Sequence, residues 1–195
     1  MSAQARRAVA LVRDNAKWEH AGQAYFTGEV EPCINGKAVA IGSYLGQDVR
    51  GIVDRLLSEQ LTDGGWNCEA ERGSTRSSFN TAIDVLEGLL EHERAVGAAV
   101  GVTAARHKGQ EYLLDRHLFR RLSTGDVVMQ SGSASPFPPR YFYDELRGLD
   151  YVRSADVGPD ERCAGGDRPG QEQASRGRTM AVGGSPSRFG VLRPG

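Results

Sequence analysis

Residues 59–93 read EQLTDGGWNCEAERGSTRSSFNTAIDVLEGLLEHE and predict two helices joined by a polar loop. The first helix starts after Asp48, a good N-cap, and stops before the turn signal at residues 63–65. The second begins at Ser77 or Ser78 and places apolar residues at helical spacing. The glycine pair permits a tight turn with positive φ. Trp66 can then pack over the helix ends, and Gln60 can hydrogen-bond their exposed backbone, so this stretch predicts a packed helix pair.

The same alternation of helix and loop continues on both sides of this stretch. Further helices are predicted over residues 3–15, 37–45, 103–119 and 140–154. No segment alternates between apolar and polar residues as a half-buried strand does. The chain is therefore predicted to be all-α, built from antiparallel helix pairs.

Composition and charge exclude several classes of protein. The 195 residues include 24 Lys and Arg against 25 Asp and Glu, a balance that argues against a nucleic-acid partner. No apolar run approaches the roughly 20 residues of a membrane span. Cys33, Cys68 and Cys163 lie far apart with no CxxC, unlike a disulfide framework. We expect a reduced, cytoplasmic protein.

Residues 158–195 differ in composition from the rest of the chain. They hold nine glycines and four prolines, few bulky apolar residues and no periodicity. Such a Gly-, Pro- and Arg-rich segment cannot bury enough apolar surface to fold, so we predict a disordered tail. The helical domain is assigned to residues 1–157.

The tail from Cys163 onward also fits a chain that is read out of frame. Met180 and Ala181 are encoded by ATG GCN, and a shift by one base must read TGG, a tryptophan codon. The same shift over residues 177–181 permits Asp-Gly-Arg-Trp-Pro, which resembles the turn at residues 63–66. The alternative is a natural low-complexity tail. Resequencing the locus is expected to reveal a break in the reading frame, and an in-frame tail in close relatives would refute it.

Three stretches carry a family resemblance: residues 59–93, GEVEPCINGKAVAIGSYLGQD at 28–48, and FPPRYFYDELRGLDYVR at 137–153. Residues 59–93 resemble the prenyltransferase and squalene-oxidase repeat of the α/α-toroid superfamily, which includes terpenoid cyclases and protein prenyltransferases. The other two stretches resemble segments of a set of bacterial toroid proteins. The resemblance implies a ring of paired helices around an apolar cavity. Six helices cannot close such a ring, so it further implies a truncated member, an incomplete α/α toroid.

The resemblance implies a prenyltransferase or terpenoid-cyclase-like activity on an isoprenoid substrate. The chain contains neither the DxDD acid of class II cyclases nor the DDxxD motif of class I synthases, and no catalytic residue is assigned. Tyr44, Trp66, Phe79 and Tyr141 are the candidate substrate contacts, with a role in helix packing as the alternative. The other interpretation is a non-catalytic toroid fragment that serves as a binding module, or an inactive truncated product. An open ring exposes apolar helix faces, so we expect self-association.

Protein prenyltransferases activate a thiol with zinc, held by a carboxylate, a cysteine two residues later and a distant histidine. Glu31 and Cys33 match the first two positions, and Asn80 stands where the family has histidine. Because a neutral amide is a poor zinc ligand, we expect Glu31, Cys33 and Asn80 to bind zinc weakly or not at all. Cys68 could approach the same site, although a single loop cysteine is usually inert. Alternatively, Cys33 is a small buried residue and Glu31 a surface charge. The candidate diphosphate-binding arginines are Arg76, Arg140 and Arg147.

Overall fold

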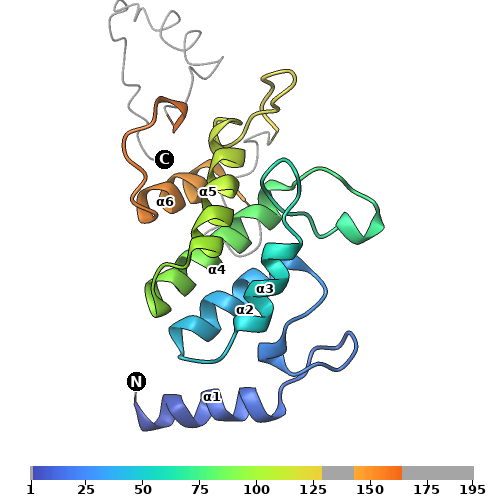
Figure 1. Cartoon of the computed structure of the whole chain (residues 1–195), viewed down its shortest axis with the longest axis vertical. Coiled ribbons are helices and arrows are strands. Elements are labelled where there is room, and N and C mark those ends of the chain that lie inside the picture. Colours follow the sequence, from blue (N-terminus) through green and yellow to red (C-terminus); the bar gives the residue numbers. More distant parts are fainter. Residues whose placement is uncertain (1, 129–142, 164–195) are drawn as a thin grey trace, which may run out of the picture. The chain divides into compact units, whose positions relative to one another are not determined.

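The computed structural model describes residues 2–128 and 143–163 (Figure 1). The regular structure of this part is helical, with two isolated β-bridges and no strand, so the predicted all-α class is confirmed. The helices are α1 (Ala3–Asn15), α2 (Pro32–Tyr44), α3 (Arg50–Ser58), α4 (Phe79–Val96), α5 (Val100–Leu114) and α6 (Glu145–Ser154). Three short 3-10 helices cover Tyr25–Thr27, Ala70–Arg72 and Glu161–Cys163. No described helix has the length and apolar character that crossing a bilayer requires.

Some helix ends agree with the sequence patterns and others differ; α3, for example, has Val49 rather than the predicted Asp48 as its N-cap. α1 matches its predicted range, and α4 runs from the N-cap Ser78 to the C-cap Gly97. α2 begins at Pro32 rather than at residue 37, because proline suits the first turn of a helix. α5 begins at Val100 rather than Thr103. α6 begins after Asp144, whose carboxylate accepts a hydrogen bond from the backbone N–H of Arg147.

α2 and α4 lie side by side and run in the same direction (Figure 1). Gly36 of α2 faces Gly88 of α4, and further along both helices Ser43 lies 3.0 Å from the ring of His92. A Cβ at Gly36 would lie 2.3 Å from the carbonyl oxygen of Asp84, and a Cβ at Gly88 would lie 2.3 Å from that of Gly36. Only glycine at both positions allows the two backbones to come this close.

α6 extends the same layer on the other side of α4. The backbone N–H of Tyr143, just before α6, donates to Asn80 at the start of α4. At the other end, Arg94 donates to the carbonyl of Ser154. α6 therefore runs parallel to α4, and α2, α4 and α6 form one layer of parallel helices.

α3 and α5 form a second layer with the opposite direction. α3 returns from the end of α2 toward its start, where Arg55 donates to the carbonyl of Val30. α5 folds back on α4 after a three-residue turn, so that Arg106 pairs with Glu93 near the end of α4. α3 and α5 also contact each other. α2 with α3 and α4 with α5 thus form the predicted antiparallel pairs.

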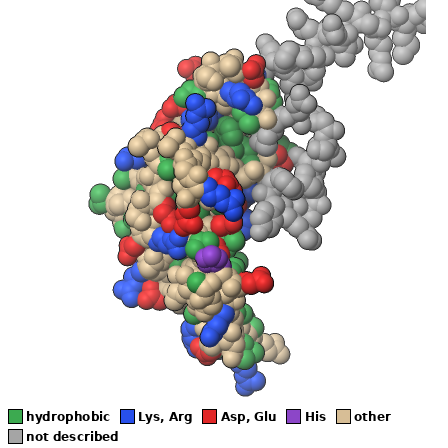
Figure 2. Space-filling view, turned by 90° about the vertical axis from the view of Figure 1, so that its right-hand side faces the viewer, with side chains coloured by type: hydrophobic (Ala, Val, Ile, Leu, Met, Phe, Trp, Pro, Cys, Tyr) green, Lys and Arg blue, Asp and Glu red, His purple; other side chains and the backbone are tan. Residues whose placement is uncertain are grey.

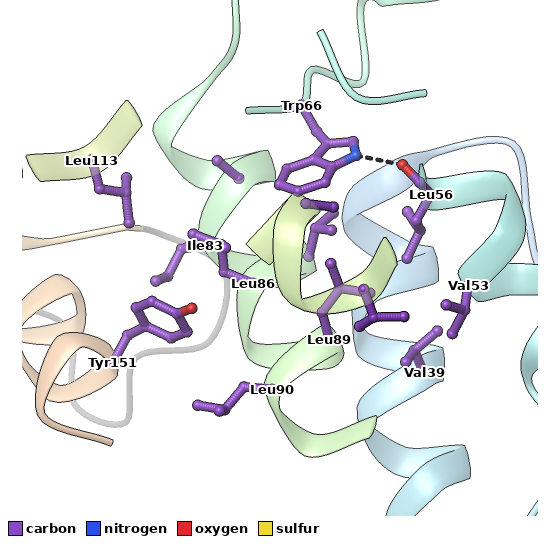
Figure 3. Close-up of a cluster of buried hydrophobic side chains, with 14 of the residues drawn as sticks. Val39, Val53, Leu56, Trp66, Ile83, Leu86, Leu89, Leu90, Leu113 and Tyr151 are labelled. Atoms are coloured by element: carbon purple, nitrogen blue, oxygen red, sulfur yellow. Dashed lines mark hydrogen bonds between the residues drawn. The ribbon is translucent and has the colours of Figure 1, made fainter. Parts of the chain in front are cut away.

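Trp66 joins the two layers and lies in the core (Figure 3). Its side chain is fully buried, and its Nε1–H donates to the carbonyl of Leu56 at 2.7 Å. Gln60 donates to the carbonyls of Gly64 and Ala105, which ties the turn to α5. Gly64 has a φ of +95°, as a tight turn requires. The predicted roles of the turn, Trp66 and Gln60 in packing are confirmed.

Several large apolar side chains are more than half exposed on the described surface: Leu11, Tyr44, Val96, Val100, Leu122 and Leu146. They are spread over several elements. On the face drawn in Figure 2, Lys and Arg side chains are mixed with Asp and Glu rather than gathered by sign. Self-association through the exposed helix faces stays a prediction.

The first residues of the predicted tail contact the helical part. Arg162 forms ion pairs with Glu111 and Asp115 around the end of α5, each at 2.8 Å. The ring of His117 lies 3.2 Å from the carbonyl oxygen of Arg162. Through these contacts the helical part of the structure extends to Cys163, which lies beyond the predicted domain boundary at residue 157. The predicted disorder of the remaining tail and its reading-frame break concern residues outside the described ranges.

Substitution of Gly36 by alanine tests the α2–α4 contact. Because the new methyl group would meet the backbone of α4, the free energy of unfolding is expected to fall by about 2–3 kcal/mol. The matched control is Gly51→Ala in α3, where nothing lies within 4 Å of an added Cβ. There the higher helix propensity of alanine is expected to raise stability by up to about 1 kcal/mol. Urea unfolding measures both changes, and equal effects would contradict the close approach.

Candidate metal centre

Glu31 and Cys33 lie at the start of α2. Glu31 is the N-cap residue and Cys33 belongs to the first turn. The buried Asn35 fixes the segment before the helix, since its side chain exchanges two 2.7 Å hydrogen bonds with the backbone N–H and carbonyl of Glu29. The backbone N–H of Glu31 also donates to the Glu29 carboxylate at 2.7 Å. As a result, a carboxylate oxygen of Glu31 lies 3.6 Å from the Sγ of Cys33.

Cys68 approaches this point from the loop between α3 and α4. The loop is anchored by Trp66, whose carbonyl accepts a hydrogen bond from the N–H of Ser78. The backbone N–H of Cys68 lies 3.4 Å from the hydroxyl of Thr81 in α4. These contacts bring the Sγ of Cys68 to 2.9 Å from that of Cys33. Two segments that are 35 residues apart therefore meet at their thiols.

Glu31, Cys33 and Cys68 form a group with the chemistry of a metal site. One ligand atom of each lies within 4.8 Å of the other two. Two thiols and a carboxylate suit zinc, whose catalytic sites use three protein ligands and leave one position open. Bond lengths of about 2.3 Å to sulfur and 2.0–2.2 Å to oxygen place tetrahedral ligand atoms about 3.5–3.8 Å apart. The Glu31–Cys33 distance fits this range, and the two sulfur atoms would have to separate by about 1 Å.

The two thiols have opposite pKa shifts. Cys33 and the hydroxyl of Thr81 stabilise a thiolate on Cys68 and lower its pKa to about 7, against the opposing effect of burial. The pKa of Cys33 is raised by Cys68, by burial and by the negative charges of Glu31 and Asp84. Cys68 is therefore the sulfur that ionises first. Both thiols are half-buried and Glu31 is exposed, so the group remains accessible from solvent.

Asn80, which the sequence pattern predicted as the third metal ligand, makes a different contact. Its side-chain oxygen accepts a hydrogen bond of 2.6 Å from the backbone N–H of Tyr143. Successive helical residues point about 100° apart, so the next residue, Thr81, faces Cys68 instead. Cys68 takes the place that the sequence pattern gave to Asn80. The sequence alone identifies Cys68 only as a loop cysteine that could approach the site, and its position two residues after the buried Trp66 is the signal that favours this role.

The predicted substrate contacts do not form one site. Tyr44 is 75% exposed at the end of α2, whereas Phe79 lies at the start of α4. Because α2 and α4 are parallel, these two residues are at opposite ends of the layer. Trp66 has no exposed surface and belongs to the core. Tyr141 lies outside the described residues.

A second feature is a pocket of about 670 Å³ at the start of α4 and the end of α5. Phe79 and Tyr112 give it aromatic walls, with ring centroids 5.6 Å apart. Four of its described lining residues are arginines, namely Arg76, Arg116, Arg120 and Arg121. Asp63 is the one acidic residue among the described lining residues, and it already accepts hydrogen bonds from Ser77. The pocket therefore carries a net positive charge.

Among the predicted diphosphate-binding arginines that the structure describes, Arg76 lines this pocket. Arg147 instead pairs with the buried carboxylate of Asp84 and with Glu87 between α6 and α4. Arg140 lies outside the described residues. The arginines near the end of α5, which the sequence interpretation did not single out, supply most of the positive charge.

The pKa of Cys68 can be tested by the pH dependence of its alkylation. Because the thiolate is the reactive form, the rate is expected to rise as the pH rises through about 7 and then to level off. Cys163 is the internal comparison, since burial raises its pKa and it should react only at higher pH. Cys33→Ala removes the main cause of the shift and is expected to move the Cys68 midpoint upward. Identical pH profiles for Cys68 and Cys163 would contradict the contacts described.

The chain was compared with known proteins at the level of families, curated sequences and solved structures. No family model, no curated protein and no solved structure matches it. The resemblance to the prenyltransferase and squalene-oxidase repeat therefore stays an expectation. A functional assignment has to rest on the residues of the chain itself, and first on the group of Glu31, Cys33 and Cys68.

Proposed function

We propose that this chain is a prenyltransferase-like α/α-toroid protein that binds zinc through Glu31, Cys33 and Cys68 and acts on an isoprenoid substrate. The observation that carries the proposal is the convergence of these three donors within 4.8 Å. With Asn80 as the third ligand, zinc binding would be weak. Cys68 supplies a thiolate instead, which completes a set of three strong donors with one open position.

The donor set favours a prenyltransferase over a terpenoid cyclase. Zinc bound here would hold an acceptor thiol as its thiolate near neutral pH, which is the activation that prenyl transfer to sulfur requires. A class II cyclase needs a DxDD acid, which the sequence lacks. The chain's own residues orient the donors, since Asn35 fixes the segment that carries Glu31 and Thr81 directs the Cys68 thiolate.

The arginine pocket supports an isoprenoid diphosphate as the substrate class. A diphosphate group is a multiple anion, and arginine guanidinium groups bind phosphate through charge-assisted hydrogen bonds. The start of α4, an 18-residue helix, adds the partial positive charge of a helix N-terminus. Phe79 and Tyr112 offer apolar surface beside these charges.

The order of the helices supports the toroid part of the proposal. In a ring of helix pairs, one helix of each pair lies in an inner layer and its partner in an outer layer. α2, α4 and α6 run parallel in one layer, and α3 and α5 run antiparallel to them in the other. This alternation supports the proposal that α2, α4 and α6 are the inner helices of part of such a ring.

Cobalt(II) binding to the full chain tests the metal centre. A stoichiometric Co²⁺ complex is expected to show sulfur-to-cobalt charge-transfer absorption, which Zn²⁺ then displaces. Cys68→Ser and Cys33→Ser should each lower the affinity by more than about 100-fold, because loss of a ligand costs more than loss of its outer hydrogen bonds. Asn80→His is the matched control and should leave the affinity unchanged, since residue 80 points toward Tyr143.

Native mass spectrometry of the same preparations with zinc and farnesyl diphosphate tests the substrate class. The chain is expected to retain one metal ion and one diphosphate, and the double change of Arg76 and Arg121 to alanine should abolish diphosphate retention only. Arg153→Ala, at an exposed arginine of α6 that pairs with Asp150, is the control. Retention of the metal alone would indicate a non-catalytic binding module. Retention of neither would contradict the proposal and leave an inactive fragment.

A further inference from the structure

We propose that Cys33 and Cys68 are also a redox-active dithiol, which closes reversibly to an intrachain disulfide by exchange with a small disulfide such as glutathione disulfide. The two Sγ atoms lie 2.9 Å apart, and both cysteines are free thiols. A disulfide bond is about 2.05 Å long, so the sulfur atoms have to approach by about 0.9 Å. This inference assigns a modification site that the proposed activity does not require.

The surroundings of Cys33 and Cys68 allow the disulfide to form by a small movement of side chains. Cys33 lies in the first turn of a helix, whose backbone is fixed by the Asn35 contacts. Cys68 lies in a loop, two residues after the anchored Trp66, so its side chain can shift while the loop stays attached to the core. Glu31 lies 3.6 Å from the Sγ of Cys33 and Thr81 lies 3.4 Å from that of Cys68, and the 2.9 Å between the two sulfur atoms leaves no room for another atom. Thus no described group has to leave before the bond forms.

The third cysteine belongs to a different part of the molecule. Cys163 lies in the 3-10 helix after α6 and lines the same surface hollow as Leu149 and Val152. The thiol of Cys163 therefore serves as an internal reference for a cysteine without a thiol neighbour among the described residues. Its removal by Cys163→Ser leaves a chain whose two remaining thiols are the proposed pair.

The exchange is balanced in atoms and electrons. One cysteine thiolate attacks a sulfur of glutathione disulfide, and the S–S bond breaks to release one glutathione thiolate. The second cysteine, as its thiolate, attacks the resulting mixed disulfide and releases the second glutathione. The two cysteines lose two electrons and two protons overall, and glutathione disulfide is reduced to two glutathione molecules. Excess glutathione reverses both steps.

Oxidation of the two thiols and metal binding exclude each other. This link to the metal is the one part of the inference that rests on the proposed function. Sulfur binds zinc as a thiolate, and a disulfide offers no thiolate. With Cys33 and Cys68 joined, Glu31 is the one remaining donor of the group. A reversible disulfide in a reducing compartment is typically catalytic or redox-sensing rather than structural. The pair would thereby couple metal occupancy to the thiol–disulfide balance.

The experiment uses the full chain with Cys163→Ser, stripped of metal by a chelator and incubated with glutathione disulfide. Alkylation and mass spectrometry count the free thiols. We expect the count to fall from two to none with the loss of two hydrogen atoms and no glutathione adduct, and to return to two in excess glutathione. Cys33→Ala and Cys68→Ala, each added to Cys163→Ser, should give one glutathione adduct and no intrachain bond.

Three results would overturn the inference: thiols that stay free in excess glutathione disulfide, two stable glutathione adducts on one chain, or disulfide-linked dimers as the main product. A cobalt titration on the same samples separates this inference from the proposed function. Pairing of the thiols without cobalt binding would preserve the dithiol and remove the metal centre. Cobalt binding without pairing of the thiols would preserve the metal centre and remove the dithiol.

Discussion

The close contact between α2 and α4 is the constraint on which the rest of the structure depends. Gly36 and Gly88 let the two backbones approach to a distance that any side chain would prevent. Because the helices are parallel, this contact sets the start of α2, with Glu31 and Cys33, beside the start of α4, with Thr81. The candidate metal centre therefore depends on how two helices pack, because local sequence brings Glu31 to Cys33 but not Cys68 to either of them.

Two further interactions complete the arrangement. Trp66 fixes the loop to α3 through its hydrogen bond to Leu56, and this loop delivers Cys68 to the same point. Asp84, nearly buried, accepts ion pairs from Lys37 of α2 and Arg147 of α6, which links the three parallel helices. A buried carboxylate without partners would be strongly destabilising, so these pairs specify which helices lie next to α4. Stability and site geometry thus depend on the same contacts.

Much of the fold could be predicted from the sequence, because helix ends and turns are set by residues that are close together in the chain. Ser78 and Gly97 mark the ends of α4, and the turn before Trp66 needs only glycine and a large ring to be recognised. The candidate site could be predicted only in part. It depends on which way each residue points around its helix axis and on whether neighbouring helices run parallel or antiparallel. A step of one residue, from Asn80 to Thr81, changes which side chain faces the thiols. The separation of Tyr44 from Phe79 likewise follows from the parallel direction of two helices, which periodicity does not reveal.

The central claim is that helix packing brings two sulfur donors from separate segments to one metal ion. X-ray absorption at the zinc edge of the zinc-loaded full chain tests it most directly, since it counts the sulfur atoms bound to the metal. The account predicts two sulfur ligands at about 2.3 Å, with oxygen completing the coordination. A spectrum with one sulfur ligand or none would show that Cys33 and Cys68 do not hold the same ion, and it would contradict the account.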